Sequence, residues 1–218
     1  FYSKLDSAKS AINTMAESLS KNKKLDVTYS IVSFSGWKKG DIGAPHEIEW
    51  NDADTLADKV NLNGLKEEVN SLSAGGGTNY QAGIKNANEI AGRAGAQKAV
   101  IFVSDGNPGY YYDNNGYTKG KGNPESYDDI VAAMEAAQKE IANLRANYFF
   151  TIGVGRSEAD YTYLSDLTDQ RKYPTGYTIA VPASNIHNYS ATDEKSLKKY
   201  RGCRGAFRSR MLQSVNWK

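Results

Sequence analysis

Apolar residues recur along much of the chain at three- and four-residue steps, the spacing that puts side chains on one face of a helix. Near the start of the chain this pattern runs from Leu5 through Ile12 to Leu19. It predicts an amphipathic helix over residues 3–21. The further helices predicted in this way cover residues 80–91, 130–144, 160–167 and 193–215, and residues 52–69 are predicted to be helical in pieces.

Strands are predicted where apolar residues alternate or form short unbroken runs. The runs Ala99–Val103 and Tyr148–Val154 are unbroken, which is typical of strands covered on both faces of a parallel sheet. Other predicted strands cover residues 27–34, 46–50 and 186–191. Because strands alternate with helices, we expect one doubly wound, Rossmann-like α/β domain over residues 1–218, with a mostly parallel sheet and helices on both faces.

Composition excludes several classes of function. The chain has 218 residues with 27 Lys plus Arg and 25 Asp plus Glu, so its net charge is only +2. The basic residues form no stripe of the kind that binds nucleic acid. No apolar run reaches the roughly 20 residues needed to span a membrane. The single cysteine, Cys203, excludes a disulfide within the chain and a zinc site built on several thiolates.

Two loops carry the residue types that bind hard cations. Gly76-Gly77-Thr78-Asn79 precedes a predicted helix, and Ser104-Asp105-Gly106 follows a predicted buried strand. Ligands of open α/β sheets bind at the carboxyl ends of strands, and hydroxyl and carboxylate oxygens suit Mg²⁺, Mn²⁺ or Ca²⁺. Each loop also has a purely structural interpretation, in which Thr78 is a helix N-cap and Asp105-Gly106 is a turn.

Together and in this order, the two segments resemble the second and third parts of the metal-ion-dependent adhesion site of von Willebrand factor A domains. They are Gly76–Tyr80 and Ala99–Gly106. Val27–Ser35 and Phe149–Gly155 resemble two strands of that family, and the resemblance extends from about residue 3 to residue 198. The loop after Asp105 is most similar to bacterial members, particularly the surface and pilus-tip adhesins of Gram-positive bacteria.

The resemblance implies a binding module on the cell wall or pilus, and no enzyme. Thr78 would bind a divalent cation, with Mg²⁺ favoured over Mn²⁺ or Ca²⁺, through its hydroxyl, and Asp105 would bind it directly or through water. A carboxylate of an extracellular matrix or host surface protein would complete the cation's coordination. Alternatives are an intracellular assembly or chelatase-like subunit, a metal-free binding domain, and a hydrolase, which the lack of Gly-x-Ser-x-Gly disfavours.

The rim of this site is expected to include polar and aromatic residues of the same loops. The residues predicted to border the ligand are Asn79, Tyr110, Tyr111, Tyr112 and Tyr117. Packing within a long loop, residues 107–124, is the alternative for the tyrosines.

The family's first metal-binding segment, Asp-x-Ser-x-Ser at the end of the first strand, is absent. Asp6–Ser10 has the wrong spacing and lies in the first predicted helix. We therefore expect the central strand to come from an upstream segment or from another chain. The strands at residues 27–34 and 99–103 should flank it.

Overall fold

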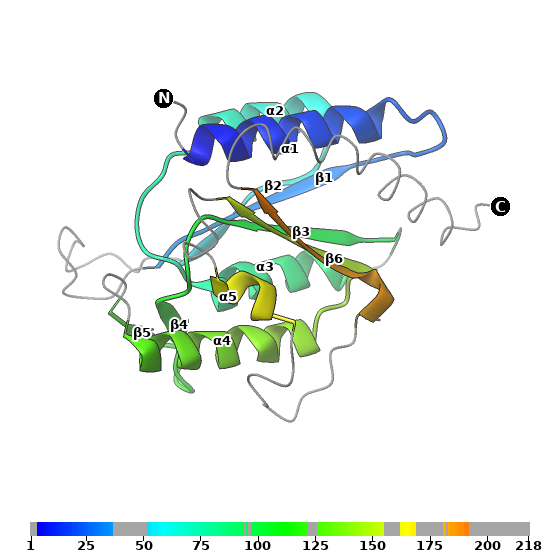
Figure 1. Cartoon of the computed structure of the whole chain (residues 1–218). Coiled ribbons are helices and arrows are strands. Elements are labelled where there is room, and N and C mark those ends of the chain that lie inside the picture. Colours follow the sequence, from blue (N-terminus) through cyan, green and yellow to red (C-terminus); the bar gives the residue numbers. More distant parts are fainter. Residues whose placement is uncertain are drawn as a thin grey trace.

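The computed structural model describes residues 4–36, 52–93, 95, 97–121, 126–154, 162–168, 181 and 183–191. A central layer of strands separates two layers of helices (Figure 1). One face is covered by α1 (Lys4–Ser20) and α2 (Leu62–Ser71). The other carries α3 (Tyr80–Ala91), α4 (Tyr127–Ala142) and the short α5 (Thr162–Asp166). The predicted α/β fold with helices on both faces is confirmed.

A three-stranded parallel sheet forms one half of the central layer. Its order is β3 (Ala99–Ser104), β6 (Tyr148–Val154) and β7 (Ile186–Ala191). Ala99 aligns with Tyr148, and the pairing continues in register to the end of β3. The three carboxyl ends therefore lie at one edge, as the unbroken apolar runs predicted.

An antiparallel pair forms the other half of the layer. In it β1 (Tyr29–Phe34) pairs with β2 (Ala53–Val60). The prediction of broken helix over residues 52–69 is therefore wrong for β2, because pairing with β1 outweighs the weak helical preference of a polar segment. Helix α2 follows at once, since the Asn61 side chain accepts hydrogen bonds from two amides of its first turn.

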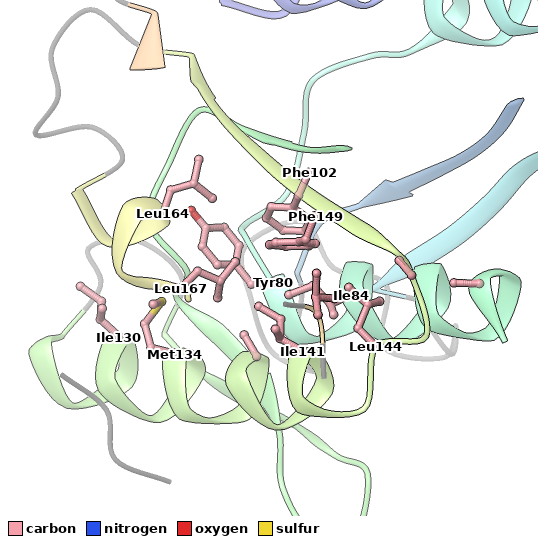
Figure 2. Close-up of a cluster of buried hydrophobic side chains, with 14 residues drawn as sticks. Tyr80, Ile84, Phe102, Ile130, Met134, Ile141, Leu144, Phe149, Leu164 and Leu167 are labelled. Atoms are coloured by element: carbon pink, nitrogen blue, oxygen red, sulfur yellow. The ribbon is translucent and has the colours of Figure 1, made fainter. Parts of the chain in front are cut away.

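The larger hydrophobic core lies between the parallel sheet and the helices α3, α4 and α5. Figure 2 shows Tyr80, Phe102 and Phe149 close together in its centre, and all three are buried. Tyr80 meets Phe102 edge-on, with ring centroids 5.0 Å apart. A smaller core on the other face comprises Ala16, Ile31, Leu65 and Val69.

The two halves of the central layer are not joined by hydrogen bonds between the strands that the structure describes. Within that part of the chain, β1 pairs only with β2, and β3 pairs only with β6. Side chains bridge the halves instead, because the rings of Phe34 and Phe102 stack with centroids 4.7 Å apart. On the opposite face of β3, Ile101 and Val103 are only half-buried. The strands expected to flank a central strand therefore each leave one edge unpaired with any described strand.

Three further segments differ from the sequence predictions or lie outside the described residues. Residues 107–124 were predicted to be loop, but they contain a hairpin of β4 (Tyr110–Tyr112) and β5 (Thr118–Gly120). The predicted strand at residues 46–50 and the predicted helix at residues 193–215 fall outside the described residues.

Candidate functional site

The end of β1 is hydrogen-bonded to the glycine-rich loop that precedes α3. The Gly77 amide donates to the Gly36 carbonyl at 2.8 Å, and the Asn79 amide donates to the Ser35 carbonyl at the same distance. These two bonds hold residue 78 between them. The loop is therefore fixed to the strand edge at which ligands of such sheets bind.

Thr78 faces the loop that follows β3. A Cβ placed on Gly106 would lie 3.7 Å from the Thr78 Oγ1 atom, so the two loops are in contact. The Thr78 side chain is half-buried and Asp105 is exposed. The cap of α3 is Asn79, whose side chain accepts from the Ala82 amide at 3.0 Å. The interpretation of Thr78 as the helix cap is therefore wrong, and its hydroxyl does not serve α3.

Hydrogen bonds from three elements order the Asp105 loop. The Ser104 and Tyr80 hydroxyls donate to the Gly106 carbonyl at 3.0 and 2.6 Å. Lys4, in the first turn of α1, donates to the Asp105 carbonyl at 3.3 Å. Burial raises the pKa of the Tyr80 hydroxyl, a hydrogen bond with Ser104 opposes that rise, and the negative charge of Asp105 adds to it. Tyr80 is thus a buried support of this loop, which the helical spacing alone did not reveal.

Tyr110 is buried, with 4% of its surface exposed, and it packs on two glycines. A Cβ on Gly77 would lie 2.1 Å from the Tyr110 ring, and a Cβ on Gly36 would lie 2.4 Å from it. The Tyr110 ring therefore packs against both the end of β1 and the loop before α3, and fixes their relative position. This contact explains why glycine is needed at both positions, and it leaves Tyr110 little surface to offer a ligand.

Asn79 and Tyr112 also make contacts within the protein, although Tyr112 is only half-buried. Asn79 is fully buried, and its Nδ2 donates to Asp52 Oδ2 at 2.8 Å. The Tyr112 amide donates to Gln81 Oε1 at 2.8 Å. Burial raises the pKa of the Tyr112 hydroxyl, and the charge of Asp52 and a hydrogen bond with it raise that pKa further. Both residues are therefore engaged with other parts of the protein, and their contact with a ligand stays a prediction.

The hairpin tip is the part of the loop that faces solvent. Tyr117 is 68% exposed, whereas Tyr111 is half-buried. The tip is ordered because Asp113 Oδ1 accepts from the Asn115 and Tyr117 amides at 2.9 Å each. These bonds lower the pKa of Asp113. Among the predicted tyrosines, Tyr117 is therefore the most exposed to solvent, and Tyr127, which was not predicted, is exposed at the start of α4.

The described residues offer two candidate ligands for a cation. Thr78 and Asp105 offer a hydroxyl and a carboxylate, both hard oxygen ligands of the kind that Mg²⁺ prefers. Within the described part of the chain there is no group of three or more His, Cys, Asp or Glu residues that could enclose an ion. Two side-chain ligands fit such an ion chemically but do not fill an octahedron.

Residues 1–107 match the von Willebrand factor type A domain family. The chain carries a von Willebrand factor type A domain. The match ends just after Gly106, so it includes both Thr78 and Asp105. A search of curated proteins found no match to the chain.

Solved structures of pilus proteins share the fold of this A-type domain. The PilB minor pilin from Streptococcus sanguinis has a TM-score of 0.73 at 16% identity, over 99% of this chain and 57% of that one. The pilus adhesin SpaC from Lactobacillus rhamnosus GG has a TM-score of 0.54 at 12% identity, over 94% of this chain and 28% of that one. The chain thus spans little more than half of PilB and under a third of SpaC.

The packing of Tyr110 on Gly77 makes a direct prediction for stability. Gly77→Ala should lower the free energy of unfolding by about 1–3 kcal/mol, because the added methyl group collides with the ring. Gly75→Ala is the matched control, since no atom lies within 4 Å of a Cβ there. It should change stability by no more than about 0.5 kcal/mol. Urea denaturation measures both, and equal effects of the two substitutions would contradict this packing.

Proposed function

We propose that this A-type domain is a binding module of a bacterial surface or pilus protein, which captures a protein ligand through a divalent cation and catalyses no reaction. The observation that carries this proposal is the convergence of Thr78 with the Asp105-Gly106 loop. The two loops are far apart in the sequence but are in contact at the carboxyl edge of the strands, where Thr78 is half-buried and Asp105 is exposed.

The chemistry of the donors supports a hard cation, with Mg²⁺ favoured over Mn²⁺ or Ca²⁺. Thr78 would bind the ion through its hydroxyl, and Asp105 would bind it directly or through water. When bound, the cation offers a strong electrostatic contact to a carboxylate of the ligand. The residues around it order the two loops: Tyr80 and Ser104 hold the Gly106 carbonyl, and Gly36 holds the Gly77 amide.

We also propose that the remaining ligands come from an extended strand that lies between β1 and β3. The facing edges of these strands pair with no described strand, and the α1 side of β3 is half-buried at Ile101 and Val103. Lys4 places the first turn of α1 beside Asp105. A strand that entered α1 there would end next to Thr78 and Asp105, where an Asp-x-Ser-x-Ser sequence would face the cation.

The fold relatives support a location on the cell surface or pilus and a protein ligand. PilB is a minor pilin and SpaC is a pilus adhesin, and both share the fold over nearly the whole chain. No helix among the described residues is long and apolar enough to cross a membrane. The exposed Tyr117 on the hairpin tip provides an aromatic contact of the type enriched in protein interfaces.

Removing either proposed ligand should weaken cation binding. In the full chain, Thr78→Ala and Asp105→Ala should each reduce Mg²⁺ affinity at least about tenfold, because even outer-shell changes have effects of that size. Glu89→Gln, an exposed carboxylate on α3, is the control and should leave affinity unchanged. Titration calorimetry measures all three. Unchanged Mg²⁺ affinity in both variants would contradict the proposed site.

Adding the proposed strand should complete both the sheet and the site. A peptide with Asp-x-Ser-x-Ser at the end of an apolar strand should raise the melting temperature and the Mg²⁺ affinity of residues 1–218. A hundredfold excess over its Kd should stabilise the folded chain by about 2.7 kcal/mol. A control peptide with Ala at the Asp and Ser positions should stabilise the fold without raising Mg²⁺ affinity. If neither peptide changes the melting temperature, no strand fits between β1 and β3.

A further inference from the structure

Asp52 is a buried carboxylate that the proposed cation site does not use. It lies immediately before β2, and only 1% of its surface is exposed. Its main-chain carbonyl accepts from the Ser35 amide at 2.7 Å, which continues the pairing of β1 with β2 by one residue. Burying a charged group is costly unless donors satisfy it, so the position requires specific partners.

The partners of the carboxylate come from separate elements. Asp52 Oδ2 accepts from Asn79 Nδ2 at 2.8 Å and from Thr118 Oγ1 at 2.9 Å. Thr118 lies on β5 opposite Tyr112 on β4, and the Tyr112 hydroxyl also interacts with this carboxylate. One side chain thus connects the cap of α3 to both strands of the hairpin.

The bond to Asn79 determines which way its amide group points. With Nδ2 directed at Asp52, the Oδ1 atom is left facing the start of α3, where it accepts from the Ala82 amide at 3.0 Å. The cap residue directly follows Thr78. Any change in the orientation of Asn79 therefore acts on the peptide that carries the proposed cation ligand.

A second connection joins the same two units. The Gly109 and Tyr110 amides, at the base of the hairpin, donate to the Thr78 carbonyl at 3.0 and 3.1 Å. Thr78 is thus tied to the hairpin directly, and it is tied again through Asn79, Asp52 and Thr118. Thr78, Asn79, Asp52 and the hairpin are therefore joined in a closed cycle of hydrogen bonds. Loosening any one of these bonds weakens the restraint on all four.

We infer that Asp52 is a positioning residue, which couples the order of the β4–β5 hairpin to that of Thr78 without contacting a cation or a ligand. The exposed hairpin tip and the loop that carries Thr78 then respond as one unit, so a partner that binds the tip also stabilises the Thr78 loop. The coupling itself rests on the contacts described above. Only its effect on cation affinity rests on the proposed function.

Hydrogen exchange of individual amides in the full protein tests the coupling. The Asn79 amide reports on the Thr78 loop, and the Gly109 and Tyr110 amides report on the hairpin base. Thr118→Val removes the hairpin's anchor but keeps the bond between Asn79 and Asp52. It should speed exchange of all three amides by roughly tenfold, the change expected from one lost hydrogen bond.

Asp52→Asn should produce the same pattern, because an amide group cannot accept as many bonds as a carboxylate. Adding Asn79→Asp to it should slow exchange again, since aspartate also caps helices and can accept from the new amide. Asp58→Asn, on β2, is the matched control, because this carboxylate accepts from Ser30 Oγ at 2.7 Å. It should leave the three amides unchanged.

The outcomes separate this inference from the proposed function. If Thr118→Val speeds the hairpin amides but leaves Asn79 unchanged, the coupling is wrong. The Mn²⁺ affinity of the same variant, measured by electron paramagnetic resonance, should fall about tenfold, as for other changes beyond the direct ligands. Unchanged Mn²⁺ affinity would overturn the link to the cation site. If the parent protein binds no Mn²⁺, the proposed function fails, and the exchange rates alone decide on the coupling.

Discussion

The candidate site depends on main-chain hydrogen bonds that hold Thr78 from two sides. The amides of Gly77 and Asn79 attach its flanking residues to the end of β1, and its own carbonyl receives the amides at the base of the hairpin. With its backbone fixed, the Thr78 hydroxyl stays beside the Asp105-Gly106 loop. Glycines at positions 36 and 77 make this possible, because a larger residue would collide with the Tyr110 ring. The same hydrogen bonds and glycine contacts therefore determine both the packing of Tyr110 and the position of the Thr78 hydroxyl.

The central layer shows where further ligands for the proposed cation site could enter. Phe34 and Phe102 stack across the boundary between the antiparallel pair and the parallel sheet, so the two halves are held at a defined position by side chains. Their facing edges are nevertheless unpaired among the described strands. The same edges border Thr78 and Asp105. A strand placed there would satisfy backbone groups and supply ligands together, which couples completion of the fold to completion of the site.

Much of this fold could be predicted from sequence, because the regular spacing of apolar residues indicates which side of each helix or strand is buried. The strands at residues 148–154 and 186–191 have the predicted bounds, and the loops that carry Thr78 and Asp105 are in contact. β2 was missed because its polar residues show no strand alternation and its structure comes from pairing. The hairpin was missed although Asn115-Gly116 is a turn signal. Nothing in the sequence around Asp52 indicates burial, which arises only when Asn79 and Thr118 converge on it.

Paramagnetic broadening by Mn²⁺ tests most directly whether the two loops form one cation site. Substoichiometric Mn²⁺ added to isotope-labelled full protein broadens the amide signals nearest to the bound ion. A shared site at Thr78 and Asp105 predicts that the first signals lost are those of residues 77–79 and 104–106 together, before those of the hairpin tip around Asp113. Loss of signals at Asp113 first, or at only one of the two loops, would contradict a shared site at Thr78 and Asp105.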